Sequence, residues 1–183
     1  MAVRTTPFIA AGTWTVDPAH SSVEFSVKHM GIANVRGKFN EFEGTLEVGE
    51  DLAHSRAHGT VKVASIDTNE EKRDAHLRSP DFFNVEEHPE ITYETTRIEP
   101  RDEESSCVYG NLTMHGVTKP ITTSMTVTPT PSSFAASGVF RAKATDFGFD
   151  PYSAPFGVLK NRDEMKFVVV YGLPQKKAGV SSI

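Results

Sequence analysis

Alternation of apolar and polar residues is the feature that most constrains this chain. From Ser22 to Lys28 the apolar residues Val23, Phe25 and Val27 occupy every second position. Because successive side chains of a strand point to opposite faces, this spacing predicts a strand with one buried face. Similar segments, separated by turn residues, begin near Thr13, Val35, Ala57, Ile91, Val108, Ile121, Gly138 and Glu164. This series predicts an all-β, antiparallel barrel or sandwich.

Some of these segments carry details that bear on the interior. Between Val35 and Val48, Phe39 and Phe42 are three positions apart, so a bulge is expected to return both rings to one side. From Ile91 onward, Ile91, Tyr93 and Thr95 share one face. We therefore expect these side chains to point into the molecule.

The stretch from Ser65 to Pro89 is the one passage that favours a helix. Thr68 and Glu71 have the spacing of a capping box, which predicts a short helix starting at Thr68. Ser79-Pro80 predicts a further helical turn that carries the adjacent Phe82 and Phe83. We expect this stretch to cover one opening of the barrel.

Composition indicates one domain and excludes some functions. The chain has 183 residues and a net charge of -5, so it lacks the basic surface of a nucleic-acid or anionic-membrane binder. No apolar run approaches the roughly 18 residues of a membrane span, so we expect no stable membrane insertion. We divide the chain into a flexible lead (1–12), one barrel domain (13–173) and a flexible tail (174–183).

The single cysteine and the N-terminus bear on location. Cys107 has no partner for an intrachain disulfide and no activating neighbour in sequence, so we interpret it as a half-buried strand thiol. The apolar run from Phe8 to Ala11 is too short for a signal peptide. Together these features favour a cytoplasmic protein.

The polar residues give no specific catalytic or metal motif. The seven histidines include His54 and His58, four positions apart, but none stands in an HExxH, CxxC or HxH pattern. The charges between Asn69 and Arg78 are typical of a solvated helix face. We therefore assign no catalytic and no metal residue, although a metal- or base-dependent enzyme using His and Asp residues near 69–78 remains an alternative.

The apolar faces are rich in phenylalanine, with 12 in the chain. These rings either fill a solid core or line a slot for an apolar ligand. The pattern alone leaves both interpretations open.

Several motifs resemble the YceI-like family, in the expected order from Gly12 to Leu173. The resemblance is carried by Trp14 to Ser21, Gly37-Lys38-Phe39, Ser65 to Asn69, Lys72 to Ser79 with Asp81-Phe82-Phe83, Gly110 to Thr118, and Asp146-Phe147-Gly148. It implies a lipocalin-like, extended eight-stranded antiparallel barrel with one short helical insertion.

The resemblance also implies a function. Such proteins carry long amphiphiles, such as polyisoprenoids, isoprenoid quinones or fatty-acid derivatives, and share no catalytic activity. We therefore expect a bound lipid, no cofactor and no enzyme activity. The family is often dimeric, and Val168 and Val170, apolar on the second face of the last strand, agree with a homodimer. A stress-related structural protein with a filled core is a further alternative.

The resemblance makes the apolar faces candidates for a lipid-binding bore. Its expected lining is Phe25, Val27, Phe39, Phe42, Leu77, Phe82, Phe83, Ile91, Tyr93, Leu112, Met114, Phe140 and Phe167. The polar end of the ligand is expected to meet His20, Arg78 or His115.

Overall fold

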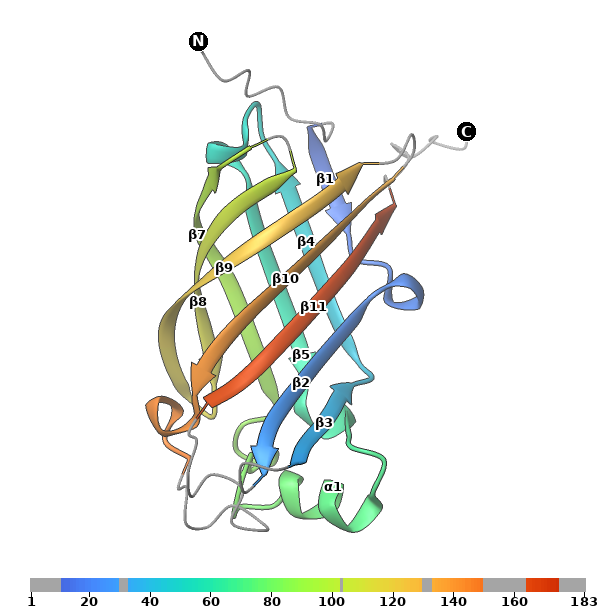
Figure 1. The fold of residues 1–183 in the computed structure, drawn as a ribbon, viewed down its shortest axis with the longest axis vertical. Helices are drawn as coiled ribbons and strands as arrows, with labels where there is room; N and C mark the ends of the chain where they lie inside the picture. Colours follow the sequence, from blue (N-terminus) through green and yellow to red (C-terminus); the bar gives the residue numbers. More distant parts are fainter. Residues whose placement is uncertain (1–10, 30–32, 103, 130–132, 150–163, 175–183) are drawn as a thin grey trace, which may run out of the picture.

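One curled antiparallel sheet forms the body of the protein (Figure 1). The computed structural model describes residues 11–29, 33–102, 104–129, 133–149 and 164–174. The strands are β1 (Gly12–Thr15), β2 (Ser22–His29), β3 (Ala33–Phe39), β4 (Phe42–Val48), β5 (Arg56–Lys62), β6 (Ile66–Asp67), β7 (Glu90–Pro100), β8 (Ser105–Met114), β9 (Val117–Pro129), β10 (Ser133–Lys143) and β11 (Glu164–Pro174). The 3-10 turns are η1 (Pro18–His20), η2 (Leu52–His54), η3 (Val63–Ser65) and η4 (Ala144–Phe147), and α1 spans Glu71–Arg78.

The strand order explains how the sheet curls around an interior. It runs β1-β4-β5-β7-β8-β9-β10-β11-β2-β3-β6, so six of the ten neighbouring pairs are consecutive in the chain. β1 and η1 also contact β11, on the far side of the curl. The prediction of an antiparallel, lipocalin-like barrel with one short helix is confirmed for the described residues.

The expected number of strands was wrong. The described residues form eleven strands rather than eight. Val35 to Val48 is divided into β3, beside β2, and β4, beside β5. The break falls at Asn40 and Glu41, whose backbones bond to Ser65 (3.1 Å) and Lys62 (2.9 Å) instead of continuing a strand.

The helix begins later than its sequence signal predicts. Glu70, and not Thr68, is the N-cap, and its carboxylate accepts a hydrogen bond from the Arg73 N–H. Asn69 has a left-handed φ of 67°, which separates Thr68 from the helix. The Thr68 N–H and hydroxyl instead donate to the buried carboxylate of Asp74, at 2.9 and 2.5 Å.

An aromatic turn follows α1 and closes one end of the barrel, the lower end in Figure 1. This segment forms hydrogen-bonded turns rather than the helical turn predicted at Ser79-Pro80. Phe82 stacks on Phe149 with centroids 4.7 Å apart, and Phe83 meets Phe149 edge-on at 5.3 Å. The ring centroids of Phe83 and of Phe39 on β3 are 6.3 Å apart, and this contact joins the turn to the sheet.

We predict that Asp74→Ala lowers the free energy of unfolding by about 2 kcal/mol, because it leaves buried Thr68 donors without their acceptor. Urea denaturation followed by circular dichroism measures this change. Asp81→Ala is the matched control, since Asp81 is exposed and pairs only with His76 at 3.2 Å. It should cost less than about 1 kcal/mol. Equal losses in the two variants would contradict the anchoring role of Asp74.

Candidate functional site: an apolar cavity

A cavity of about 190 Å³ lies inside the curled sheet. It is bounded by the main apolar cluster, which includes Phe39 and Phe167, and by a second cluster that includes Val16 and Ala136. Side chains of both clusters line it, and the lining is almost wholly apolar. The arrangement suits hydrocarbon, because burying apolar surface is favourable and needs no directed contact.

Part of the cavity wall is bare backbone. Gly44 of β4 and Gly59 of β5 are paired across the ladder, and both line the cavity. A Cβ added at Gly59 would meet only the Glu43 carbonyl oxygen, at 3.8 Å. The space beside Gly59 is therefore open to a ligand.

A further glycine lets a tyrosine lie flat against the adjoining part of the wall, where Tyr93 is the ladder partner of Gly59. The Tyr93 ring of β7 covers Gly110 of β8, where any Cβ would overlap the ring. A register shift between Thr95 and Arg97 then allows Thr95 and Ile98, three positions apart, both to line the cavity.

The hydroxyl groups on this wall are unusual for an apolar site. Within the described part of the chain, the buried hydroxyl oxygens of Tyr93 and Thr95 have no hydrogen-bond partner. Burial raises the pKa of the Tyr93 phenol above its ordinary value of 10.0, and the nearby Thr95 hydroxyl opposes this shift more weakly. The two hydroxyls therefore lie close together without a hydrogen bond of normal geometry.

About half of the residues predicted to line the bore lie at this cavity. They are Phe39, Phe42, Ile91, Tyr93, Leu112, Phe140 and Phe167. Phe140 and Phe167 stack on each other with centroids 4.8 Å apart, so adjacent strands present one flat aromatic surface. Their contact with a ligand stays a prediction.

Other predicted lining residues pack elsewhere. Leu77, Phe82, Phe83 and Met114 are buried in the closed end and do not line the cavity. Phe25 lies over Gly37, and its ring centroid is 5.4 Å from that of Phe39. The Val27 side chain lies outside the described part of the structure.

The polar residues expected at the ligand's head group do not reach the cavity. His20 is exposed and bonds to Asp17 at 2.6 Å. Arg78 lies 3.8 Å from Glu71 at the helix, and the His115 ring bonds to the Phe147 carbonyl at 3.0 Å and stacks on Phe149. The described structure therefore gives none of these three side chains access to the cavity.

Sequence reasoning missed several residues of the wall. Their alternation was visible, but they are neither aromatic nor charged, and so did not stand out. They include Val16, Val23, Leu46, Ala57, Gly59, Val61, Thr95, Ile98, Ser106, Val108, Thr123, Met125, Val127, Ala136 and Val169.

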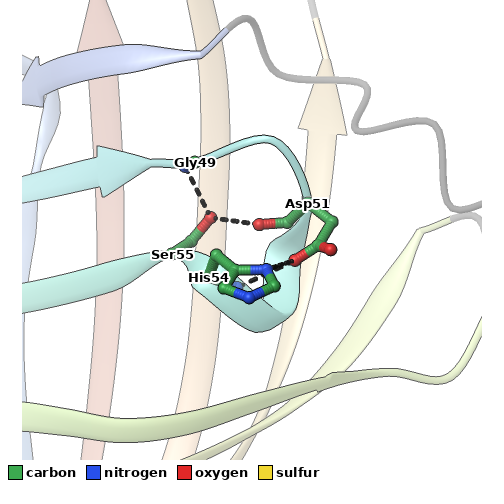
Figure 2. A network of polar contacts seen from close by, with 4 residues as sticks. All are labelled: Gly49, Asp51, His54 and Ser55. Atoms are coloured by element: carbon green, nitrogen blue, oxygen red, sulfur yellow. Dashed lines mark hydrogen bonds and ion pairs between the residues drawn. The ribbon is translucent and has the colours of Figure 1, made fainter.

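The two histidines considered for a metal lie on different elements: His54 belongs to the turn η2, and His58 lies on β5. Figure 2 shows His54 bonding to the Asp51 carboxylate at 2.6 Å, while the Ser55 hydroxyl donates to the Asp51 carbonyl at 2.9 Å. The hydrogen bond from His54 holds the pKa of Asp51 below its ordinary value of 3.8. Among the described residues, no group of three His, Cys, Asp or Glu side chains could hold a metal ion.

The acidic and basic groups near α1 also have local partners. Arg73 donates to the Thr68 hydroxyl at 2.8 Å and to the Thr68 carbonyl at 2.7 Å, and Asp74 accepts from Thr68. Asp67 accepts from the Asn69 N–H, which lowers the pKa of Asp67. None of these side chains lines the cavity.

The fold and cavity can now be compared with known proteins. A family model described as the YceI-like domain matches residues 14–171. The chain belongs to the YceI-like family. A UPF0312 protein of Pectobacterium atrosepticum is 40% identical over 103 residues, covering 56% of this chain and 53% of that protein. A UPF0312 protein of Vibrio campbellii is 38% identical over 120 residues, covering 63% and 64%. The chain therefore spans about half the length of the first relative and less than two thirds of the length of the second.

Solved structures show the same YceI-like fold. BcnA of Burkholderia cenocepacia superposes with a TM-score of 0.76 and 23% identity, covering 86% of this chain and 98% of that one. A polyisoprenoid binding domain from Saccharophagus degradans superposes with a TM-score of 0.73 and 15% identity, covering 89% and 98%. No helix in the described part of this YceI-like chain is long and apolar enough to cross a membrane.

We predict that Tyr93 ionises at a higher pH than an ordinary tyrosine. Unfolded tyrosine loses its proton near pH 10, whereas the buried phenol keeps it, so the folded state binds more protons there. Stability should therefore fall as pH rises through about 10 toward the folded pKa. Absorbance titration of the phenolate, compared between the wild type and Tyr93→Phe, measures the shift. An ordinary pKa for the tyrosine lost in the variant would contradict burial of this phenol.

Proposed function

We propose that this protein binds a long amphiphilic lipid in the cavity and carries it without chemical change. The candidate classes are polyisoprenoids, isoprenoid quinones and fatty-acid derivatives. The observation that carries this proposal is the apolar cavity itself, with its open space beside Gly59. A solid core would leave no such space, so the cavity favours a carrier over a structural protein with a filled interior.

The size of the cavity defines how a ligand would occupy it. Its 190 Å³ exceeds the roughly 150 Å³ of an engineered apolar cavity that binds benzene. It is smaller than the roughly 300 Å³ at which pockets for drug-sized ligands begin. We infer that the cavity holds one segment of a lipid tail, and that the wall widens or the chain extends beyond it for a longer ligand. Each buried methylene contributes about 0.8 kcal/mol.

Two further observations support the proposal. One structural relative is named as a polyisoprenoid binding domain and shares this fold over 89% of the chain. Asp74 and Arg73, near α1, lie away from the cavity and both bond to Thr68. A carrier function accounts for both, whereas an enzyme would require reactive groups at the ligand.

The homodimer stays a prediction. The apolar second face of β11 suggested it, and the side chains of Val168 and Val170 lie outside the described part of the structure. Sedimentation velocity of the purified protein would determine the state directly.

Native mass spectrometry tests the carrier function. We expect protein purified from cells to carry an adduct that organic solvent releases and that fragments as a lipid. After extraction, the protein should bind a fluorescent fatty-acid or polyisoprenoid probe. Absence of both the adduct and probe binding would contradict the proposed function.

We predict that Gly59→Leu blocks the probe while leaving the protein folded, because the new side chain enters the open space beside the β5 backbone. Probe affinity should fall at least about tenfold, which corresponds to about 1.4 kcal/mol. Glu47→Leu is the matched control, since it adds the same side chain at an exposed position of adjacent β4 that does not line the cavity. Thermal unfolding verifies the fold of each variant. Unchanged probe binding in a folded Gly59→Leu protein would place the lipid elsewhere.

A further inference from the structure

The cavity lining is mostly apolar but includes hydroxyl-bearing residues, among them Tyr93, Thr95, Ser106 and Thr123. The Tyr93 and Thr95 hydroxyl oxygens are both buried and lack hydrogen-bond partners among the residues that the structure describes. Thr95 is only 6% exposed, and both residues line the cavity. Burying a hydroxyl without a partner is costly, so two such groups facing one cavity indicate that a ligand atom satisfies them.

The backbone holds these hydroxyls in place. Gly110 gives the Tyr93 ring room to lie against β8, since any larger residue would push the ring away from the wall. Thr95 is directly opposite Gly110 in the ladder, and the irregularity in the β7–β8 pairing begins at Thr95. The site is therefore built by the register of these strands, and not by flexible side chains on a loop.

Apolar residues flank the site along β7. Ile91 precedes the pair and Ile98 follows it, and both line the cavity. The ligand oxygen that meets the hydroxyls must therefore have hydrocarbon on both sides. This excludes a terminal head group that stays in water.

Charge selects the class of oxygen. The described residues that line the cavity include no lysine or arginine, and its histidine and acidic residue, His58 and Glu43, are both exposed. A buried carboxylate or phosphate would therefore lack a counter-ion, which is unfavourable in an apolar site. A neutral carbonyl oxygen, in contrast, accepts hydrogen bonds from both hydroxyls without adding charge.

We propose that Tyr93 and Thr95 form a subsite for a neutral carbonyl oxygen within the apolar part of the ligand. This inference rests on the proposed carrier function and specifies which lipids the cavity prefers. It also relocates polar recognition, from the barrel ends where His20 and His115 lie to the interior of the sheet.

The test compares three ligands of equal chain length on extracted protein: an alkane, the ketone with its carbonyl at mid-chain, and the fatty acid. Each displaces a fluorescent lipid probe. We expect the ketone to bind roughly tenfold more tightly than the alkane, as for one or two added hydrogen bonds. Tyr93→Phe and Thr95→Val should each reduce this preference while retaining affinity for the alkane.

Matched controls come from outward positions of neighbouring strands. Tyr109→Phe removes a phenol that donates to Glu99 at 3.2 Å, and Thr122→Val removes an exposed hydroxyl of β9. Both controls should keep the full preference for the ketone. Loss of the preference in these controls would overturn the assignment of the subsite to Tyr93 and Thr95.

The remaining outcomes separate the two proposals. Equal affinity of the wild type for alkane and ketone, or tighter binding of the fatty acid than of the ketone, would overturn the carbonyl subsite and leave the carrier function intact. Failure of all three ligands would overturn the carrier function. If a variant does not fold, infrared spectroscopy of the wild type still tests whether the bound ketone accepts hydrogen bonds at the subsite. A lowered carbonyl stretching frequency of the bound ketone supports the subsite, and an unshifted frequency overturns it.

Discussion

The interior depends on large side chains that lie flat over glycines of the neighbouring strand. Phe25 covers Gly37, Tyr93 covers Gly110, and a Met125 side chain occupies the space over Gly138. Each glycine removes the Cβ that would otherwise push the larger group toward the centre of the barrel. Large residues can therefore cover the wall without filling the interior. Gly44 and Gly59 pair across the ladder; Val16 covers Gly44, whereas the wall beside Gly59 remains open.

The closed end of the barrel uses its aromatic and charged residues differently from the middle. Phe82, Phe83 and Phe149 pack at the closed end, and α1 is fixed over them by hydrogen bonds between Thr68 and Asp74. These contacts are local and leave the cavity wall almost wholly apolar. The stretch from Ser65 to Pro89, which has the most distinctive sequence motif, thus closes the barrel. The surface that could recognise a ligand lies instead on strands with less distinctive sequences.

The sequence predicted most of the fold, because alternation identifies strands and their buried faces. It did not reveal the break at Asn40 or the late helix start. Both depend on hydrogen bonds that the alternation does not encode: the Asn40 N–H donates to the Ser65 carbonyl, and Thr68 donates to the Asp74 carboxylate. The site was harder to predict. Phe82 and Phe39 look equally apolar in sequence, and only the curl of the sheet decides which ring packs at the end and which faces the cavity. The unpartnered state of Thr95 is likewise a property of the register of β7 and β8.

The bare wall at Gly59 has a consequence for ligand length. Its backbone tolerates a side chain, because a Cβ there meets nothing nearer than 3.8 Å. Single substitutions to alanine, valine or leucine would shorten the available space in graded steps without altering strand pairing. If the cavity holds a lipid as proposed, this one position sets the length of chain that fits, and a change at this residue alters that length within the same barrel.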